Sequence, residues 1–118
     1  MTDSIKIYHN PRCSKSRETL GLLQDKGITP TVVEYLTTPP SVAEIEKLLK
    51  MLGFSDARQL MRTKEELYKE LKLADTALTQ AQLIKAMHDN PKLIERPIVV
   101  KGKKAKLGRP PEQVLEIL

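Results

Sequence analysis

One stretch near the N-terminus decides how this chain is interpreted: residues 8–17 read Tyr-His-Asn-Pro-Arg-Cys-Ser-Lys-Ser-Arg. The pair Asn10-Pro11 is a turn signal, and residues 16–26 then show the spacing of a helix that ends at Gly27. Cys13 is therefore predicted at the start of this helix, where unsatisfied backbone N–H groups and the helix dipole favour an anion. Because the thiolate is the reactive form of cysteine, the placement predicts a reactive thiol.

Two further features of the same stretch favour the thiolate. The segment Arg12–Arg17 contains three cations and no acid. His9 precedes the turn and is predicted either to act on the sulfur, through a hydrogen bond or a positive charge, or to make a structural hydrogen bond. A lone cysteine is often only a small buried apolar side chain. The polar surroundings of Cys13 favour the reactive alternative.

The chain contains one cysteine, so no internal disulfide can form. Ser16 stands where a dithiol enzyme would have its second cysteine, and an outside thiol such as glutathione would have to release any adduct of Cys13. The cysteine usage and the absence of an apolar leader in residues 1–10 predict a cytoplasmic protein. No apolar run reaches the length of a membrane span, so we expect no membrane association.

The order of predicted elements indicates an α/β fold. Strands are predicted at 4–8, 30–35, 98–100 and 104–107, helices at 13–27 and from 110 onward, and a helical block at 41–90. A βαβ unit followed by a ββα unit gives a four-stranded mixed sheet, which matches a thioredoxin-like fold with a helical insertion between its halves. We expect one domain over residues 1–118, with Val114, Leu115 and Leu118 on the buried side of the last helix.

Charge is concentrated in the C-terminal third. The net charge is +5, and residues 96–109 contain six cations and no acid. Nucleic acid is not expected as a partner, because the chain has three tyrosines, one phenylalanine and no tryptophan for base stacking. Arg96 and Arg109 flank the predicted hairpin and could converge at the rim of one site. Pro97 stands where thioredoxin-like folds hold a cis-proline beside the active cysteine.

Several segments together resemble a known family, the glutaredoxin-linked arsenate reductases of bacteria. The resemblance extends over nearly the whole chain and rests on these segments: Tyr8-His9-Asn10-Pro11 leading to Cys13, Leu60-Met61-Arg62, Asn90-Pro91, Arg96-Pro97-Ile98-Val99-Val100, and Arg109-Pro110. It implies a thioredoxin-like fold with Cys13 as the nucleophile and His9 favouring its thiolate. It also implies a substrate site for arsenate or a similar small oxyanion that includes Arg62, Arg96, Arg109, Asn10 and Ser16.

The reaction that the resemblance implies needs no tightly bound cofactor and no metal. The Cys13 thiolate attacks arsenic and displaces water, giving a covalent thiol–arsenate adduct. Glutathione, as cosubstrate, reduces the adduct and leaves a mixed disulfide with Cys13, and glutaredoxin resets the enzyme. No Cys/His cluster is present in the sequence to hold a metal.

One departure from the family pattern keeps two alternatives open. The residues Ser14-Lys15-Ser16 are more basic than the Gly-Thr-Ser of plasmid-borne family members. One alternative is a housekeeping paralogue acting on another substrate, and the nearest rival enzyme is a glutathione-dependent thiol–disulfide reductase. The same fold also includes redox-linked regulators that bind RNA polymerase, but these usually have a C-x-x-C pair, and Ser16 argues against that role.

Overall fold

The computed structural model describes residues 4–118, which divide into two compact units. The first unit contains the N-terminal segment up to Thr38 together with Arg96–Leu118, and the second contains Pro39–Glu95. The second unit is the helical insertion predicted between the two halves of the sheet, and its position in the chain is confirmed. That residues 1–118 act as a single domain stays a prediction.

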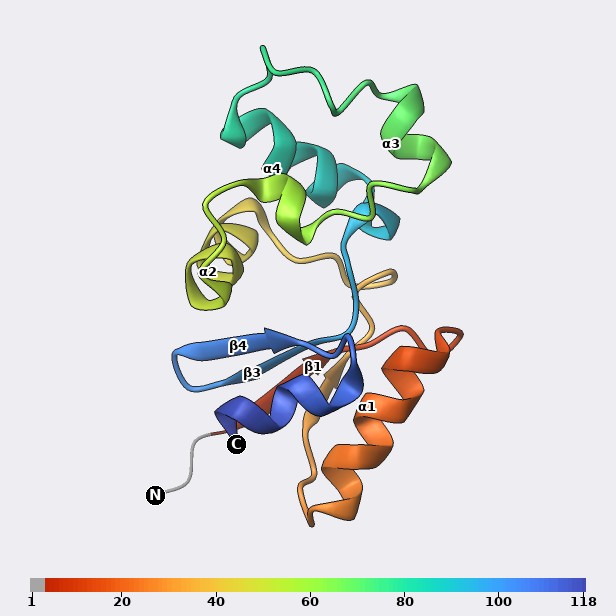
Figure 1. The fold of residues 1–118 in the computed structure, drawn as a ribbon, viewed down its shortest axis with the longest axis vertical. Coiled ribbons are helices and arrows are strands. Elements are labelled where there is room, and N and C mark those ends of the chain that lie inside the picture. The colour runs from red at the N-terminus through yellow and green to blue at the C-terminus, as the bar shows by residue number, and fades with distance from the viewer. Residues whose placement is uncertain (1–3) are drawn as a thin grey trace. The chain divides into compact units, whose positions relative to one another are not determined.

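The first unit is built on a four-stranded sheet (Figure 1). Its strands are β1 (Ile5–Tyr8), β2 (Thr31–Val33), β3 (Ile98–Lys101) and β4 (Lys104–Leu107), in the spatial order β2-β1-β3-β4. β1 pairs parallel with β2 and antiparallel with β3, and β3 pairs antiparallel with β4. The predicted mixed sheet is therefore confirmed. The second strand is shorter than predicted, because it forms an edge of the sheet and only three of its residues pair with β1.

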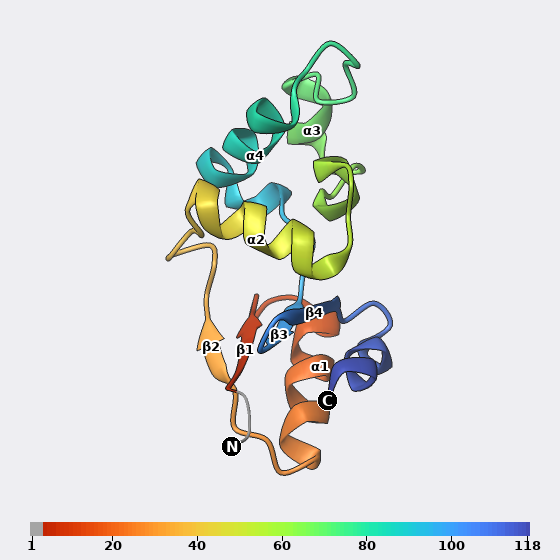
Figure 2. The same ribbon diagram turned by 90° about the vertical axis from the view of Figure 1, so that its left-hand side faces the viewer.

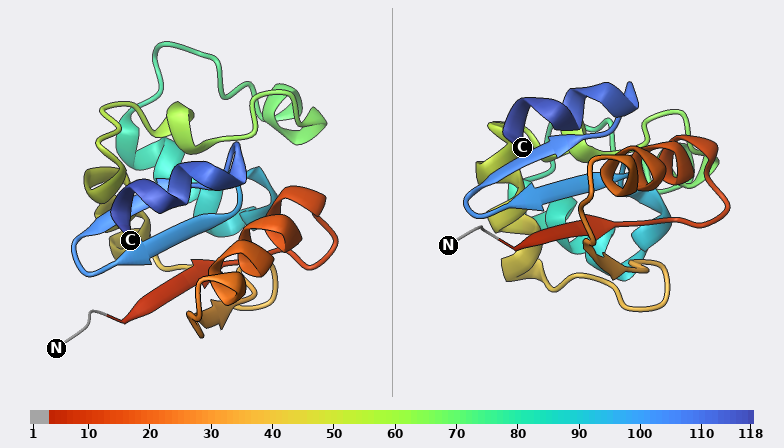
Figure 3. Two further views of the ribbon diagram at one scale, coloured as in Figure 1. Left: turned by 60° about the horizontal axis from the view of Figure 1, so that its bottom comes forward. Right: turned by 90° about the horizontal axis from the view of Figure 1, so that it is seen from below.

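One face of this sheet is covered by α1 (Ser14–Asp25) and the 3-10 helix η3 (Pro111–Ile117), which lie side by side on it (Figure 3). Their shared core is formed by Ile7, Leu23, Val99, Val114 and Ile117. The prediction that Leu115 is buried is wrong: its side chain is 37% exposed, and Ile117 is buried instead. The cause is the 3-10 geometry of η3, whose three residues per turn place Val114 and Ile117 on one face.

The second unit consists of helices. They are α2 (Val42–Leu52), η1 (Ala57–Leu60), α3 (Glu66–Glu70), α4 (Gln80–Asp89) and η2 (Pro91–Leu93). Helix α4 packs against α2, η1 and η2 (Figure 2). Thr79 and Gln82 form the predicted reciprocal cap of α4, and Gly53 ends α2 in the left-handed conformation at φ 75°. Within residues 4–118, no helix is long and apolar enough to cross a membrane.

Candidate active site

Cys13 occupies the N-cap of α1, as the sequence predicts. Its backbone is extended, at φ −95° and ψ 123°, and its N–H donates to the carbonyl of Asn10 at 3.0 Å, which closes the turn made by Asn10 and Pro11. The carbonyl of Cys13 accepts the first helical hydrogen bond, from Arg17, at 3.0 Å. The side chain is only 9% exposed. The thiol therefore lies at the positive end of a twelve-residue helix with little access to water.

The surroundings of the thiol favour its anion. Burial on its own raises the pKa of Cys13, but the backbone N–H of Ser16, the charge of Arg96, the backbone N–H of Lys15 and the charge of Arg109 lower it, and the net pKa is below the ordinary value. The two backbone groups belong to the first turn of α1, so the effect expected from the helix N-terminus is present. The local cations predicted to help come instead from residues far away in the sequence.

Arg109 makes the most direct side-chain contact with the thiol. Its Nη2 donates to Sγ of Cys13 at 3.7 Å, and its Nε donates to the carbonyl of Arg96 at 2.8 Å. The guanidinium is thereby held between the thiol and the backbone at the start of β3. Arg96 and Arg109 are also opposite each other in the hairpin, since each lies two residues beyond the last paired residues, Ile98 and Leu107. The convergence predicted from their flanking positions is present.

A buried network of His9, Ser16 and Asn10 supports the loop before Cys13. Oγ of Ser16 accepts from the backbone N–H of Asn10 at 3.0 Å and lies 2.6 Å from Nδ1 of His9. Both side chains are buried, His9 to 6% exposure and Ser16 completely. Burial lowers the pKa of His9, Arg17 lowers it further, and Glu34 opposes them. The neutral ring is therefore favoured over the imidazolium, and its tautomer sets which of Nδ1 and the Ser16 hydroxyl donates in their hydrogen bond.

The remaining predicted site residues differ in placement. Oδ1 of Asn10 accepts from the backbone N–H of Arg12 at 3.0 Å, so this side chain shapes the turn. Arg62 belongs to the second unit, where its Nη1 pairs with Glu65 at 3.0 Å and its backbone N–H donates to the carbonyl of Leu93 at 2.8 Å. Its convergence with the other two arginines stays a prediction, as does substrate binding by Asn10 and Ser16.

The Arg96-Pro97 peptide bond is cis, which confirms the prediction from the position of Pro97 before β3. The Arg109-Pro110 bond is cis as well, and this was not expected from the sequence. The repeated Arg-Pro dipeptide is the one sequence feature that could have indicated the second bond. Nothing in the sequence indicated that Gly108, which precedes Arg109, packs closely against Thr19 of α1.

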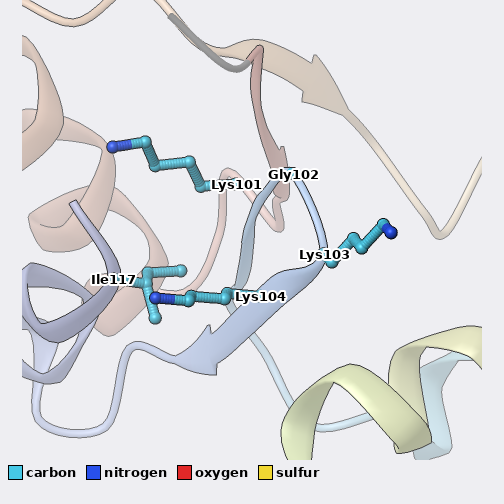
Figure 4. Close-up of a pocket in the computed structure, with 5 residues that line it drawn as sticks. All are labelled: Lys101, Gly102, Lys103, Lys104 and Ile117. Carbon is cyan, nitrogen blue, oxygen red and sulfur yellow. The ribbon is translucent and has the colours of Figure 1, made fainter.

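A separate pocket of about 420 Å³ lies at the tip of the β3–β4 hairpin (Figure 4). It is lined by Lys101, Gly102, Lys103, Lys104 and Ile117. Lys104 extends toward Ile117, Lys101 extends on the same side of the hairpin without pointing at Ile117, and Lys103 points to the opposite side. Lys101 pairs with Ile5, at the opposite end of β1 from Tyr8 and the loop to Cys13, so this pocket is distinct from the thiol site. In residues 4–118, no group of three or more His, Cys, Asp or Glu side chains could hold a metal ion.

The comparisons with known proteins agree with this geometry. The profile of the ArsC family matches residues 8–117. The chain is 64% identical to the uncharacterized protein YfgD of Escherichia coli K12, over 100% of this chain and 99% of that protein. It is 59% identical to an arsenate reductase of Haemophilus influenzae, covering 98% and 99% of the two chains. An arsenate reductase of E. coli K12 is 47% identical over 98% of this chain and 81% of that protein.

The structural comparison gives the same result. An arsenate reductase from Vibrio cholerae has a TM-score of 0.97 and 58% identity, and the match covers 100% of both chains. The mixed sheet and the thiol at the start of α1 define a thioredoxin-like α/β protein with a single cysteine at its candidate active site. The extent of the family match then settles the assignment: the chain belongs to the ArsC family.

Proposed function

We propose that the protein reduces arsenate to arsenite, with Cys13 as the nucleophile. The observation that carries the proposal is the contact between Nη2 of Arg109 and Sγ of Cys13, because it joins an oxyanion-binding group to a thiol whose pKa is lowered. Guanidinium groups bind tetrahedral oxyanions through paired hydrogen bonds. The names of the relatives from Haemophilus influenzae and Vibrio cholerae support the choice of arsenate.

The first step is attack of the Cys13 thiolate on arsenic. A sulfur–arsenic bond forms, one arsenate oxygen leaves as water after protonation, and arsenic stays at oxidation state five. Arg96 and Arg109 would stabilise the charge on the remaining oxygens, while the N–H groups of Lys15 and Ser16 hold the thiolate beforehand. Arg62 is the third proposed arginine of the substrate site.

The second step needs an outside thiol, because Cys13 is the only cysteine. We propose glutathione: its thiolate attacks Sγ, a disulfide forms, and the electron pair of the sulfur–arsenic bond passes to arsenic, which leaves as arsenite. Glutaredoxin then reduces the mixed disulfide by thiol–disulfide exchange. Because glutathione keeps thiols reduced in the cytoplasm, the proposal includes a cytoplasmic location.

The test is an assay of purified protein with arsenate, glutathione and glutaredoxin, in which arsenite formation is measured directly. Each component is omitted in turn, and Cys13→Ser is the matched control. The proposal predicts arsenite only in the complete mixture with the wild-type protein. Equal arsenite formation by Cys13→Ser, or none by the wild type, would contradict it.

A second candidate function is glutathione-dependent reduction of a different thiol or disulfide substrate. One observation keeps it open: the identity to YfgD, whose name states no activity, is higher than the identity to the arsenate reductase of the same E. coli strain. The same purified protein can be given a glutathione mixed-disulfide substrate in place of arsenate. Faster turnover of the mixed disulfide than of arsenate, lost in Cys13→Ser, would favour this candidate.

A further inference from the structure

The backbone directly after β4 approaches α1 closely at Gly108. A Cβ atom at this position would overlap Oγ1 of Thr19, and it would lie 2.8 Å from Cγ of Pro97 and 3.0 Å from Cγ2 of Thr19. The backbone conformation does not require glycine here, because Gly108 is not among the residues with positive φ. What position 108 requires is the absence of a side chain.

The neighbours of Gly108 are held in place by hydrogen bonds. Thr19 is completely buried, and its Oγ1 donates to the carbonyl of Lys15 at 2.8 Å, which fixes the rotamer. The N–H of Gly108 donates to the carbonyl of Pro97 at 2.9 Å, which fixes the backbone of the hairpin. A side chain at position 108 could therefore be accommodated only if the hairpin and α1 moved apart.

Both sides of this contact lead to the thiol. On one side, Arg109 follows Gly108 and places Nη2 3.7 Å from Sγ of Cys13. On the other side, the hydroxyl of Thr19 donates a hydrogen bond to the carbonyl of Lys15, and the backbone N–H of Lys15 is one of the groups that stabilise the thiolate. A separation of the two elements would lengthen the distance between Arg109 and Cys13 and disturb the first turn of α1 at the same time.

We propose that Gly108 is a positioning residue of the thiol site, whose lack of a side chain lets the end of the hairpin contact Thr19 and so brings the Arg109 guanidinium to Sγ of Cys13. The proposal rests on the proposed function only in taking Cys13 as the reacting group. Thr19 is the second half of the same contact. Neither residue touches the substrate; both act through Arg109 and α1.

The test is Gly108→Ala, assayed by the rate of Cys13 alkylation against pH and by arsenate turnover. We expect the midpoint of the alkylation profile to rise, and turnover to fall by about 10- to 100-fold, the range for a positioned group displaced by roughly 1 Å. Gly21→Ala is the matched control: it adds the same methyl group to α1, where nothing lies within 4 Å, and should leave both measurements unchanged. The alkylation profile needs no arsenate, so it is independent of the substrate.

Two double variants separate positioning from a general effect on folding. Adding Arg109→Lys to Gly108→Ala should raise the alkylation midpoint little further, because both changes remove the same contact. Adding Thr19→Ala removes two of the three close atoms and should return the midpoint part of the way to the wild-type value. If Gly108→Ala alone does not fold, the double variant Gly108→Ala/Thr19→Ala becomes the test. Pro97 remains close to position 108 in that variant, so a smaller rise of the alkylation midpoint is still expected. An alkylation midpoint equal to that of the wild type in folded Gly108→Ala would overturn the proposal. If the single variant does not fold, the same result in Gly108→Ala/Thr19→Ala would overturn it. Fully additive effects of Gly108→Ala and Arg109→Lys on the midpoint would also overturn it.

Discussion

Nη2 of Arg109 lies 3.7 Å from Sγ of Cys13, although the two residues are 96 positions apart in the chain. The contact combines two functions in one guanidinium. It lowers the pKa of the thiol, and its other N–H groups are of the kind that bind an oxyanion. A group that lowers the pKa of the nucleophile and would also bind the proposed oxyanion is expected to be sensitive to conservative change.

The first prediction concerns Cys13. Cys13→Ser should fold as the wild type does, because serine is close in size to cysteine and the N-cap position favours it. Arsenite formation should fall to the background of the assay, since the described site contains no other thiol. Circular dichroism establishes the fold and the arsenate assay the loss. Turnover well above background would show that another group is the nucleophile.

The second prediction concerns Arg109. Arg109→Lys keeps the charge but loses the forked geometry that reaches Sγ and the Arg96 carbonyl together. Arsenate turnover should fall by about 10²- to 10³-fold, the usual effect of losing one preorganised donor. Lys103→Arg at the distant hairpin tip is a suitable control and should leave turnover unchanged. A loss of less than about twofold would make Arg109 an ordinary surface cation.

The third prediction separates Arg62 from the other two arginines. If Arg62 binds the substrate, Arg62→Lys should raise the KM for arsenate or lower turnover, while the alkylation profile of Cys13 stays unchanged. Arg96→Gln should change both, because the charge of Arg96 also lowers the pKa of the thiol. Steady-state kinetics and iodoacetamide alkylation give the two readouts. Wild-type kinetics in Arg62→Lys would restrict Arg62 to its ion pair with Glu65.

The fourth prediction concerns His9. His9→Ala removes the hydrogen-bond partner of the Ser16 hydroxyl and leaves Ser16 buried without it, so the loop before Cys13 should loosen. The pKa of Cys13 should rise as a result. His9→Asn, which can place an oxygen near the position of Nδ1, should restore part of the shift. An unchanged alkylation profile in His9→Ala would show that the network is structural only.

The fifth prediction is a pH dependence of stability. The folded pKa of Cys13 lies below its value in the unfolded chain, so the stabilising contribution of the thiolate is fully present above the unfolded pKa and is lost as the pH falls through the folded pKa. The difference in free energy of unfolding between wild type and Cys13→Ser should therefore grow with pH up to about 8.5, the pKa of a free thiol. Urea unfolding under reducing conditions at several pH values measures it. A difference that shrinks as the pH rises would mean that the folded pKa is raised.

Short sequence patterns correctly predicted the turns and helix ends that depend only on residues adjacent in the chain. The turn at Asn10-Pro11 and the start of α1 at Cys13 follow from residues adjacent in the chain, as does the cap of α4 by Thr79 and Gln82. The exposure of Leu115 could not be predicted this way, because it depends on whether the last segment forms an α-helix or a 3-10 helix. That choice is made by packing against the sheet.

The site itself depends on contacts over long sequence separations. The sequence indicated that Arg96 and Arg109 could converge, but the bond from Arg109 to the Arg96 carbonyl is a property of the folded hairpin. The contact between Thr19 and Gly108 is of the same kind, since neither residue has a distinguishing neighbour. For His9, the sequence left open a role on the sulfur or a structural hydrogen bond, and the structure shows a hydrogen bond to Ser16. Its partner Ser16 and its lowered pKa depend on burial.

The hairpin that connects the two arginines has a further consequence for how this chain can change. Arg96 and Arg109 are matched across the ladder that runs from Ile98 and Leu107 to Lys101 and Lys104, so their alignment depends on the pairing and not on the tip. Extra residues inserted between Gly102 and Lys103 would lengthen the tip and leave the alignment intact. Deleting one residue from either strand would slip the ladder and separate the pair. The tip is therefore a suitable place to graft a peptide or a fluorescent label. An insertion or a deletion within β3 or β4 is expected to disrupt the site.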